Sequence, residues 1–211
     1  MASLLFRTLA AVLVAASLVE ATVTPGHAQS DTPEARFISS LGERAIYLLS
    51  AETLTAEQRT AGFSELLSSG FALDDIGRFV LGRYWKSASE AQRRSYLPLF
   101  RQYVISTYAS RLQGYAGETF TIVGQRHAGA KDVIVRTRIA RPGGGTLIDA
   151  DWRIRKFEGQ FRIIDVMVEG ISMAITQRQE FSSVVRRQGM TGLIAELSAR
   201  TAGVAEAGFQ N

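Results

Sequence analysis

The chain contains no cysteine, and only two of its 211 residues are histidine. The lack of cysteine excludes disulfides and thiolate metal ligands, so packing alone must hold the fold. His127 is the only histidine beyond residue 28, and it stands two residues before Gly129 in an expected hairpin. A zinc site or a Ser-His-Asp triad is therefore hard to build, and we expect His127 to be a surface loop residue.

Lysine is also scarce. Of the 24 basic residues only Lys86, Lys131 and Lys156 are lysines, and the formal net charge is +4. Arginine, which makes up the rest, suits bidentate contact with phosphate. In an exported protein that phosphate would belong to a lipid headgroup rather than to nucleic acid. A GC-rich genome that favours arginine codons explains the bias equally well.

The first 28 residues have the pattern of an export signal. Arg7 precedes an apolar run from Leu9 to Val19, and the small residues of Gly26-His27-Ala28 follow. A basic start, a short apolar run and small residues before the cut are typical of a secretory signal peptide. The run is shorter than the roughly 20 residues of a transmembrane helix.

We expect cleavage after Ala28 and a periplasmic location. An uncleaved anchor is the alternative, because Glu20 and Thr22 blur the end of the apolar run. The mature chain, residues 29–211, has a length that forms one domain with a substantial core. The last residues, 199–211, are mostly small and polar, so we expect this tail to fray.

The spacing of apolar residues changes once along the chain. Over residues 32–112 they recur at helical intervals, with capping boxes at Thr55 and Ser89. From Glu118 the period becomes two, which is typical of strands, and helices separated at Gly189 follow. The predicted class is α+β, with N-terminal helices, a curved four-stranded antiparallel sheet and C-terminal helices.

Paired carboxylates are the best candidates for acid–base chemistry. Asp149 and Asp151 share one strand face, but Arg138, Arg153 and Arg155 share the solvated surface with them. Structural ion pairs are more common than catalytic ones, so we expect a salt-bridge ladder here.

A second acidic pair, Asp165 and Glu169, flanks the turn at Gly170. We expect these residues to brace the junction between the last long strand and the next helix. The sequence predicts no catalytic residue, metal site or cofactor site.

Both layers are rich in apolar and aromatic side chains. A helical layer that stands off a curved sheet leaves an apolar cleft, which is the usual site for a small ligand. Many of these side chains simply form the core, and the sequence leaves open which of them line a void. The candidate residues for an apolar ligand are Phe79, Val80, Tyr84, Phe100, Val104, Tyr108, Val135, Ile148, Trp152, Ile154, Val166 and Val168.

Two groups of motifs stand in the order found in a known family. The first reads Phe-Val-Leu-Gly-Arg-Tyr-Trp at residues 79–85 and Ser-Glu-Ala-Gln-Arg at residues 89–93. The second reads Asp-Trp-Arg-Ile at residues 151–154 and Asp-Val-Met-Val-Glu-Gly-Ile-Ser at residues 165–172. With these motifs the chain, over about residues 35–200, resembles the MlaC-type periplasmic phospholipid-binding family, also called the toluene-tolerance auxiliary family.

The resemblance implies a soluble lipid carrier that is not an enzyme. Phospholipid acyl chains would sit in a cavity between sheet and helices. The lipid would pass between an outer-membrane lipoprotein complex and an inner-membrane ABC transporter, which maintain outer-membrane lipid asymmetry. Trp152 departs from the family pattern, where Tyr is usual.

Other interpretations stay open. A sister branch of the same family is associated with hopanoids, so the ligand could be a rigid polycyclic lipid. An NTF2-like enzyme that uses Asp165 or Glu169 as an acid on an apolar substrate is a different class of protein. A partner-binding protein with a solid core would bind no lipid at all.

Overall fold

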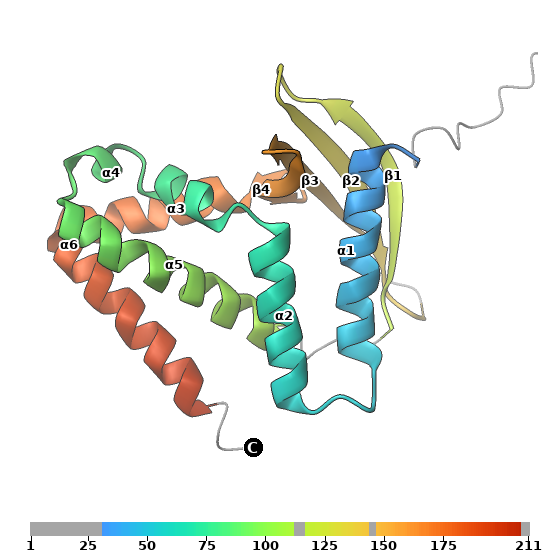
Figure 1. Ribbon diagram of the computed structural model, residues 1–211, viewed down its shortest axis with the longest axis horizontal. Helices are drawn as coiled ribbons and strands as arrows, with labels where there is room; N and C mark the ends of the chain where they lie inside the picture. The colour runs from blue at the N-terminus through green and yellow to red at the C-terminus, as the bar shows by residue number, and fades with distance from the viewer. Residues whose placement is uncertain (1–30, 112–116, 144–146, 208–211) are drawn as a thin grey trace, which may run out of the picture.

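The computed structural model describes residues 31–111, 117–143 and 147–207, with the expected signal peptide outside these ranges (Figure 1). The N-terminal half is helical, as predicted, and its helices begin at capping residues. Thr32 accepts a hydrogen bond from the backbone of Ala35, and Thr55 forms a capping box with Gln58. The helices are α1 (Pro33–Ser50), α2 (Ala56–Gly70), α3 (Leu73–Leu81), α4 (Arg83–Ser87) and α5 (Glu90–Arg111).

Gly82 separates two of these helices, α3 and α4. Its φ of 54° and ψ of −122° interrupt the helical backbone, so α3 ends at Leu81 and α4 begins at Arg83. A Cβ at this position would lie 2.7 Å from the guanidinium of Arg178. Only glycine satisfies both the backbone geometry and the close approach of α6 (Met173–Ala207).

The second half forms a curved sheet in which every neighbouring pair of strands is antiparallel. The sequence predicts four strands, and the structure adds a short fifth one after the turn at Gly170. The strands follow one another in the order β1 (Thr119–His127), β2 (Asp132–Ala140), β3 (Ile148–Phe157), β4 (Gln160–Val168) and β5 (Ile171–Ser172).

The predicted break between the C-terminal helices is confirmed, because Gly189 has a φ of 68° inside α6 and kinks it. The sequence predicts a tail that frays from residue 199, whereas α6 is helical to Ala207 and buries Thr201. Among the described residues no helix combines the length and apolar character needed to cross a bilayer.

Buried apolar side chains form two separate clusters. The helical core lies among α3, α4, α5 and α6 and includes Tyr96, Phe100 and Phe181. The sheet core lies between α1 and the sheet and includes Ile38 and Val135. In Figure 1, α1 crosses β1 and β2, while α3, α5 and α6 gather on the other side of α2. The fold therefore has two cores, which are joined mainly where α2, α3 and α6 contact β4.

Candidate functional site

The face of the sheet that looks toward α1 is apolar at its centre. Val135 and Trp152 are partners in the β2–β3 register, and Trp152 and Val166 are partners in the β3–β4 register. The ring of Phe120 lies 6.2 Å from that of Trp152 in an edge-on arrangement. Alternation along each strand brings these side chains to the same face.

Trp152 is held in place by a buried hydroxyl on this face. Its indole N–H donates a 2.8 Å hydrogen bond to Oγ1 of Thr137, which donates in turn to the carbonyl of Ala150 at 3.1 Å. Thr137 is fully buried, whereas Trp152 is half-buried. The ring is therefore fixed at its polar edge and keeps part of its apolar surface exposed.

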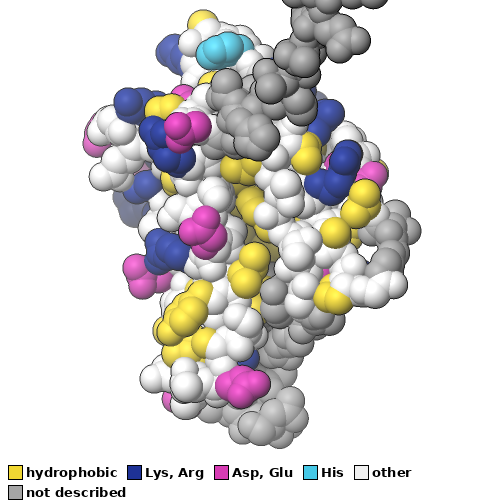
Figure 2. Space-filling model, turned by 90° about the vertical axis from the view of Figure 1, so that its right-hand side faces the viewer, with side chains coloured by type: hydrophobic (Ala, Val, Ile, Leu, Met, Phe, Trp, Pro, Cys, Tyr) yellow, Lys and Arg dark blue, Asp and Glu magenta, His cyan; other side chains and the backbone are white. Residues whose placement is uncertain are grey.

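Other apolar side chains around the sheet core are also incompletely covered. A close-packed interior would bury side chains of this size. Figure 2 shows hydrophobic side chains gathered along a strip near the middle of one face of the molecule, with charged side chains on both sides. The half-buried members packed on the sheet core are Phe37, Leu41, Phe71, Phe120, Ile122, Val133, Trp152, Phe161 and Val166.

The sequence predicted only part of this surface. Trp152 and Val166 are half-buried on the sheet core, and Ile148 and Val168 are half-buried nearby on the same two strands. Val135 and Ile154 are 0% and 1% exposed and form the sheet core itself. The aromatic side chains of Phe37, Phe71, Phe120 and Phe161 were not among the candidates. Their signal in the sequence was the same alternation and helical spacing that identified the others, so they could have been found.

The candidates on the helices pack elsewhere. Val80 and Phe100 are 0% and 1% exposed and fill the helical core, where Tyr84 and Val104 pack against it. Side chains without exposed surface cannot touch a ligand in this conformation. The sequence placed them opposite the sheet because helical spacing shows which residues share a stripe, but not which neighbour that stripe meets.

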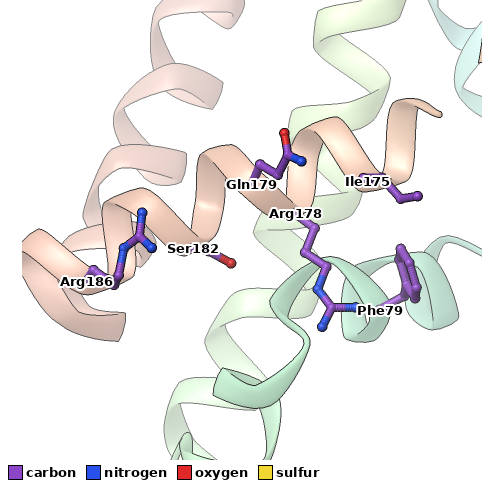
Figure 3. Close-up of a pocket in the computed structure, with 6 residues that line it drawn as sticks. All are labelled: Phe79, Ile175, Arg178, Gln179, Ser182 and Arg186. Atoms are coloured by element: carbon purple, nitrogen blue, oxygen red, sulfur yellow. The ribbon is translucent and has the colours of Figure 1, made fainter. Parts of the chain in front are cut away.

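Phe79 lies on the outside of the helical layer. It is 45% exposed, and the guanidinium of Arg178 lies 5.2 Å from its ring centroid. Both side chains line a pocket of about 470 Å³, whose lining also includes Ile175 and Arg186. Figure 3 shows these side chains between α3 and α6. Tyr108, on α5, is also an exposed large side chain, at 37%.

A second pocket, of about 260 Å³, lies against the sheet core. Val133, Ile154 and Phe161 form its apolar lining, and it is bordered by Lys131 and Lys156. Val133, Ile154 and Phe161 also belong to the sheet core or pack against it, so this pocket lies at its border.

The opposite face of the sheet carries the predicted ion pairs. Arg136 pairs with Asp151 at 2.8 Å, and Arg138 pairs with Asp149 at 2.9 Å. These carboxylates are neutralised structural groups, as the arginine-rich pattern predicted.

The most buried ion pair lies at one end of this outer face. Asp132 is 3% exposed and accepts hydrogen bonds from Arg155 at 2.6 Å and from Arg153 at 2.8 Å. Hydrogen bonding to Arg155 is the main reason that the pKa of Asp132 is lowered, with burial opposing it and Arg153 adding to it.

The turn at Gly170 is braced, as predicted. The carboxylate of Glu169 accepts the backbone N–H of Asp149 at 2.7 Å, and that of Asp165 accepts the hydroxyl of Ser172 at 2.6 Å. Both carboxylates therefore stabilise the turn through hydrogen bonds. His127 is exposed at the end of β1. In the described part of the chain no cluster of three or more His, Asp or Glu side chains could hold a metal ion.

Comparison with known proteins gives a family. The model of the MlaC protein family matches residues 41–199, which is most of the chain. The chain belongs to the MlaC family. It is 27% identical over 128 residues to the intermembrane phospholipid transport system binding protein MlaC of Haemophilus influenzae. That match covers 59% of this chain and 60% of the length of the relative.

The fold of this MlaC-family chain also has a solved counterpart. A phospholipid-binding protein from Ralstonia solanacearum, solved in complex with a phospholipid, superposes with a TM-score of 0.68. The match covers 81% of this chain and 97% of that one, at 20% sequence identity. The α+β arrangement of helices and curved antiparallel sheet is thus shared with that protein.

Proposed function

We propose that this MlaC-family protein is a periplasmic phospholipid carrier. It would bind acyl chains against the helix-facing side of the sheet and move lipid between an outer-membrane lipoprotein complex and an inner-membrane ABC transporter. The observation that carries the proposal is the half-buried apolar surface around Trp152 and Val166, on the side of the sheet that faces α1. Family membership and the names of both relatives support a phospholipid as the ligand.

The energetics of such a carrier are favourable. Each buried CH₂ group contributes about 0.8 kcal/mol, so covering one acyl chain offsets its loss from a bilayer. The site needs no catalytic group, which agrees with the structural use of Asp165 and Glu169. A junction between two cores also offers a place where the helices could shift relative to the sheet to release a tightly held lipid.

Native mass spectrometry of protein purified from the periplasm, followed by lipid extraction, tests the proposal. We expect co-purified phospholipid at a fixed ratio to protein. Recovery of hopanoid instead would assign the protein to the hopanoid branch, and absence of any lipid would contradict carriage. Hydrolysis of a lipid ester that disappears in Glu169→Gln would favour the enzyme interpretation.

A further inference from the structure

A recess on the outside of the helical layer carries two arginines and two apolar side chains. Every residue that lines it belongs to α3 or α6, and Phe79 is the member on α3. The members on α6 recur at intervals of three or four residues, so they share one side of that helix. They are Ile175, Arg178, Gln179, Ser182 and Arg186. The other side of α6 packs into the helical core, and none of the lining residues belongs to the sheet core.

The guanidinium of Arg178 is held against the end of α3. It lies 5.2 Å from the ring centroid of Phe79, and it occupies the space that a Cβ would fill at Gly82, 2.7 Å away. Figure 3 shows the side chain of Arg178 reaching from α6 to Phe79. An arginine positioned in this way loses little side-chain freedom on binding, and its planar fork suits bidentate contact with an oxyanion.

Both arginines of the recess lack an acidic partner. Within the described residues, neither Arg178 nor Arg186 has an ion pair or a hydrogen bond from its guanidinium. The neighbouring Arg187, by contrast, donates a hydrogen bond to Ser183. The described lining of the recess contains no Asp or Glu, and the whole chain has a formal net charge of +4. A partner with acidic groups would therefore complement this surface.

The shape of the recess favours a protein segment over a membrane surface. Phe79 and Ile175 expose apolar surface in it, at 45% and 50%. Arg178 and Arg186 are eight residues apart on α6, which corresponds to about 12 Å along the helix. A segment that enters this recess of about 470 Å³ can meet both its charges and its apolar surface. A bilayer surface is flat on this scale and would not fill it.

We propose that this recess is the docking site for an acidic segment of a partner protein. An apolar side chain of the segment packs on Phe79 and Ile175, and its carboxylates pair with Arg178 and Arg186. The proposal rests on the proposed carrier function, since a carrier must dock to receive and release its cargo. It adds the surface that docks and the chemistry of the segment that this surface meets.

Photocrosslinking of the full chain in the cells that produce it tests the proposal. A photoreactive phenylalanine analogue replaces Gln179, which lines the recess and is exposed. We expect a protein adduct, and mass spectrometry should place it in a segment that has more Asp and Glu than Lys and Arg and contains an apolar residue. The double variant Arg178→Gln/Arg186→Gln should lower the adduct yield about tenfold, because charge-assisted hydrogen bonds are lost.

A synthetic peptide of the captured segment provides a second measurement. Isothermal titration calorimetry should show that the peptide binds the purified mature chain. Amides in place of the peptide's carboxylates should weaken the binding about tenfold. Raising the salt concentration should also weaken it, because exposed charges are screened. A peptide that does not bind, or that binds equally well without its carboxylates, would overturn the proposal.

Matched variants separate charge from folding. Arg187→Gln removes a neighbouring arginine that does not line the recess, and it should give the adduct yield of the wild type. The melting temperature of each variant reports whether it is folded. If the double variant is unstable, Arg186→Gln alone replaces it and should lower the yield about threefold.

The outcomes distinguish docking from lipid carriage. Arg178→Gln/Arg186→Gln should co-purify lipid at the wild-type ratio, because neither arginine lies on the sheet. If the wild type co-purifies no lipid, the carrier function itself fails, whatever the adducts show. If the wild type carries lipid but Gln179 gives no protein adduct, gives an adduct with membrane lipid instead, or gives one whose yield the double variant leaves unchanged, the carrier function stands and the docking site is wrong.

Discussion

The indole N–H of Trp152 donates a 2.8 Å hydrogen bond to the buried hydroxyl of Thr137, one strand away on the helix-facing side of the sheet. The bond satisfies the polar edge of the ring and orients it. The rest of the indole lies among apolar side chains that remain half-buried, including Phe120 and Val166. Trp152 is therefore the fixed centre of the surface that we assign to acyl chains.

Substituting Trp152→Arg should abolish lipid loading while leaving a partly folded protein. The guanidinium would lie against acyl chains with no group to hydrogen-bond or pair with. Burying an unpaired charge in this way costs on the order of several kcal/mol. Lipid co-purification measured by native mass spectrometry checks this. Thr119→Arg, which adds the same side chain at an exposed position of β1 opposite Ala140, is the control and should load normally. Loading of Trp152→Arg at the wild-type ratio would remove Trp152 from the ligand surface.

Thr137→Val should destabilise the protein by about 1–3 kcal/mol, because it leaves the indole N–H without its acceptor in a poorly solvated place. The substitution keeps the volume of the side chain and removes only the hydroxyl. Urea denaturation gives the free energy of unfolding. Thr137→Ser keeps the hydroxyl and should be milder, and equal losses for both variants would show that the hydrogen bond does not matter.

The stability contributed by Asp132 should depend on pH. Its pKa is lowered in the folded state by Arg155, so its contribution is present above the unfolded pKa of about 4. It is lost as the pH falls through the lowered folded value. Because both arginines stay partly exposed, Asp132→Asn should cost about 1–2 kcal/mol at pH 7. The gap to the wild type should shrink below about pH 4.

Asp149→Asn serves as the reference for that measurement. Its ion pair with Arg138 is 41% and 44% exposed on the two sides, so its loss should change the free energy of unfolding much less than the loss of Asp132 does. A gap for Asp132→Asn that stays constant from pH 7 to pH 2 would mean that its effect comes from packing rather than from charge.

Gly170→Val should lower stability by at least about 1–2 kcal/mol, because Gly170 has a φ of 77° and a branched residue resists that conformation. No other atom lies within 4 Å of the position of a Cβ there, so the cost is one of backbone conformation and not of space. Thermal unfolding compares it with Gly170→Asn. Asparagine tolerates positive φ, so Gly170→Asn should lose much less thermal stability than Gly170→Val. Equal losses would show that the backbone conformation is not the cause.

Local signals in the sequence predicted local structure well. Thr55 with Gln58 and Ser89 with Gln92 cap their helices as expected, since both partners of each box stand three residues apart. Alternation along β3 correctly separated Trp152 from the charged outer face. These features depend on residues that are close in the chain, so they can be predicted without knowledge of the tertiary structure.

The division into two cores could not be predicted in this way. Phe100 packs edge-on against Phe181 at 6.2 Å, from a helix more than 70 residues away in the chain. The helical spacing of apolar residues around Phe100 is equally compatible with a side chain that points toward the sheet. The pairing of Val135 with Trp152 likewise needed the strand register, which the sequence leaves open until turns and bulges are known.

The position of the acyl chains is tested most directly by photolabelling. The protein is loaded with a phospholipid that carries a photoreactive group on one acyl chain, irradiated, and mapped by mass spectrometry of its peptides. We predict adducts on the helix-facing side of the sheet, at Trp152, Val166 and Phe120. Adducts confined to the outer pocket of Phe79 and Ile175 would contradict a binding site between sheet and helices.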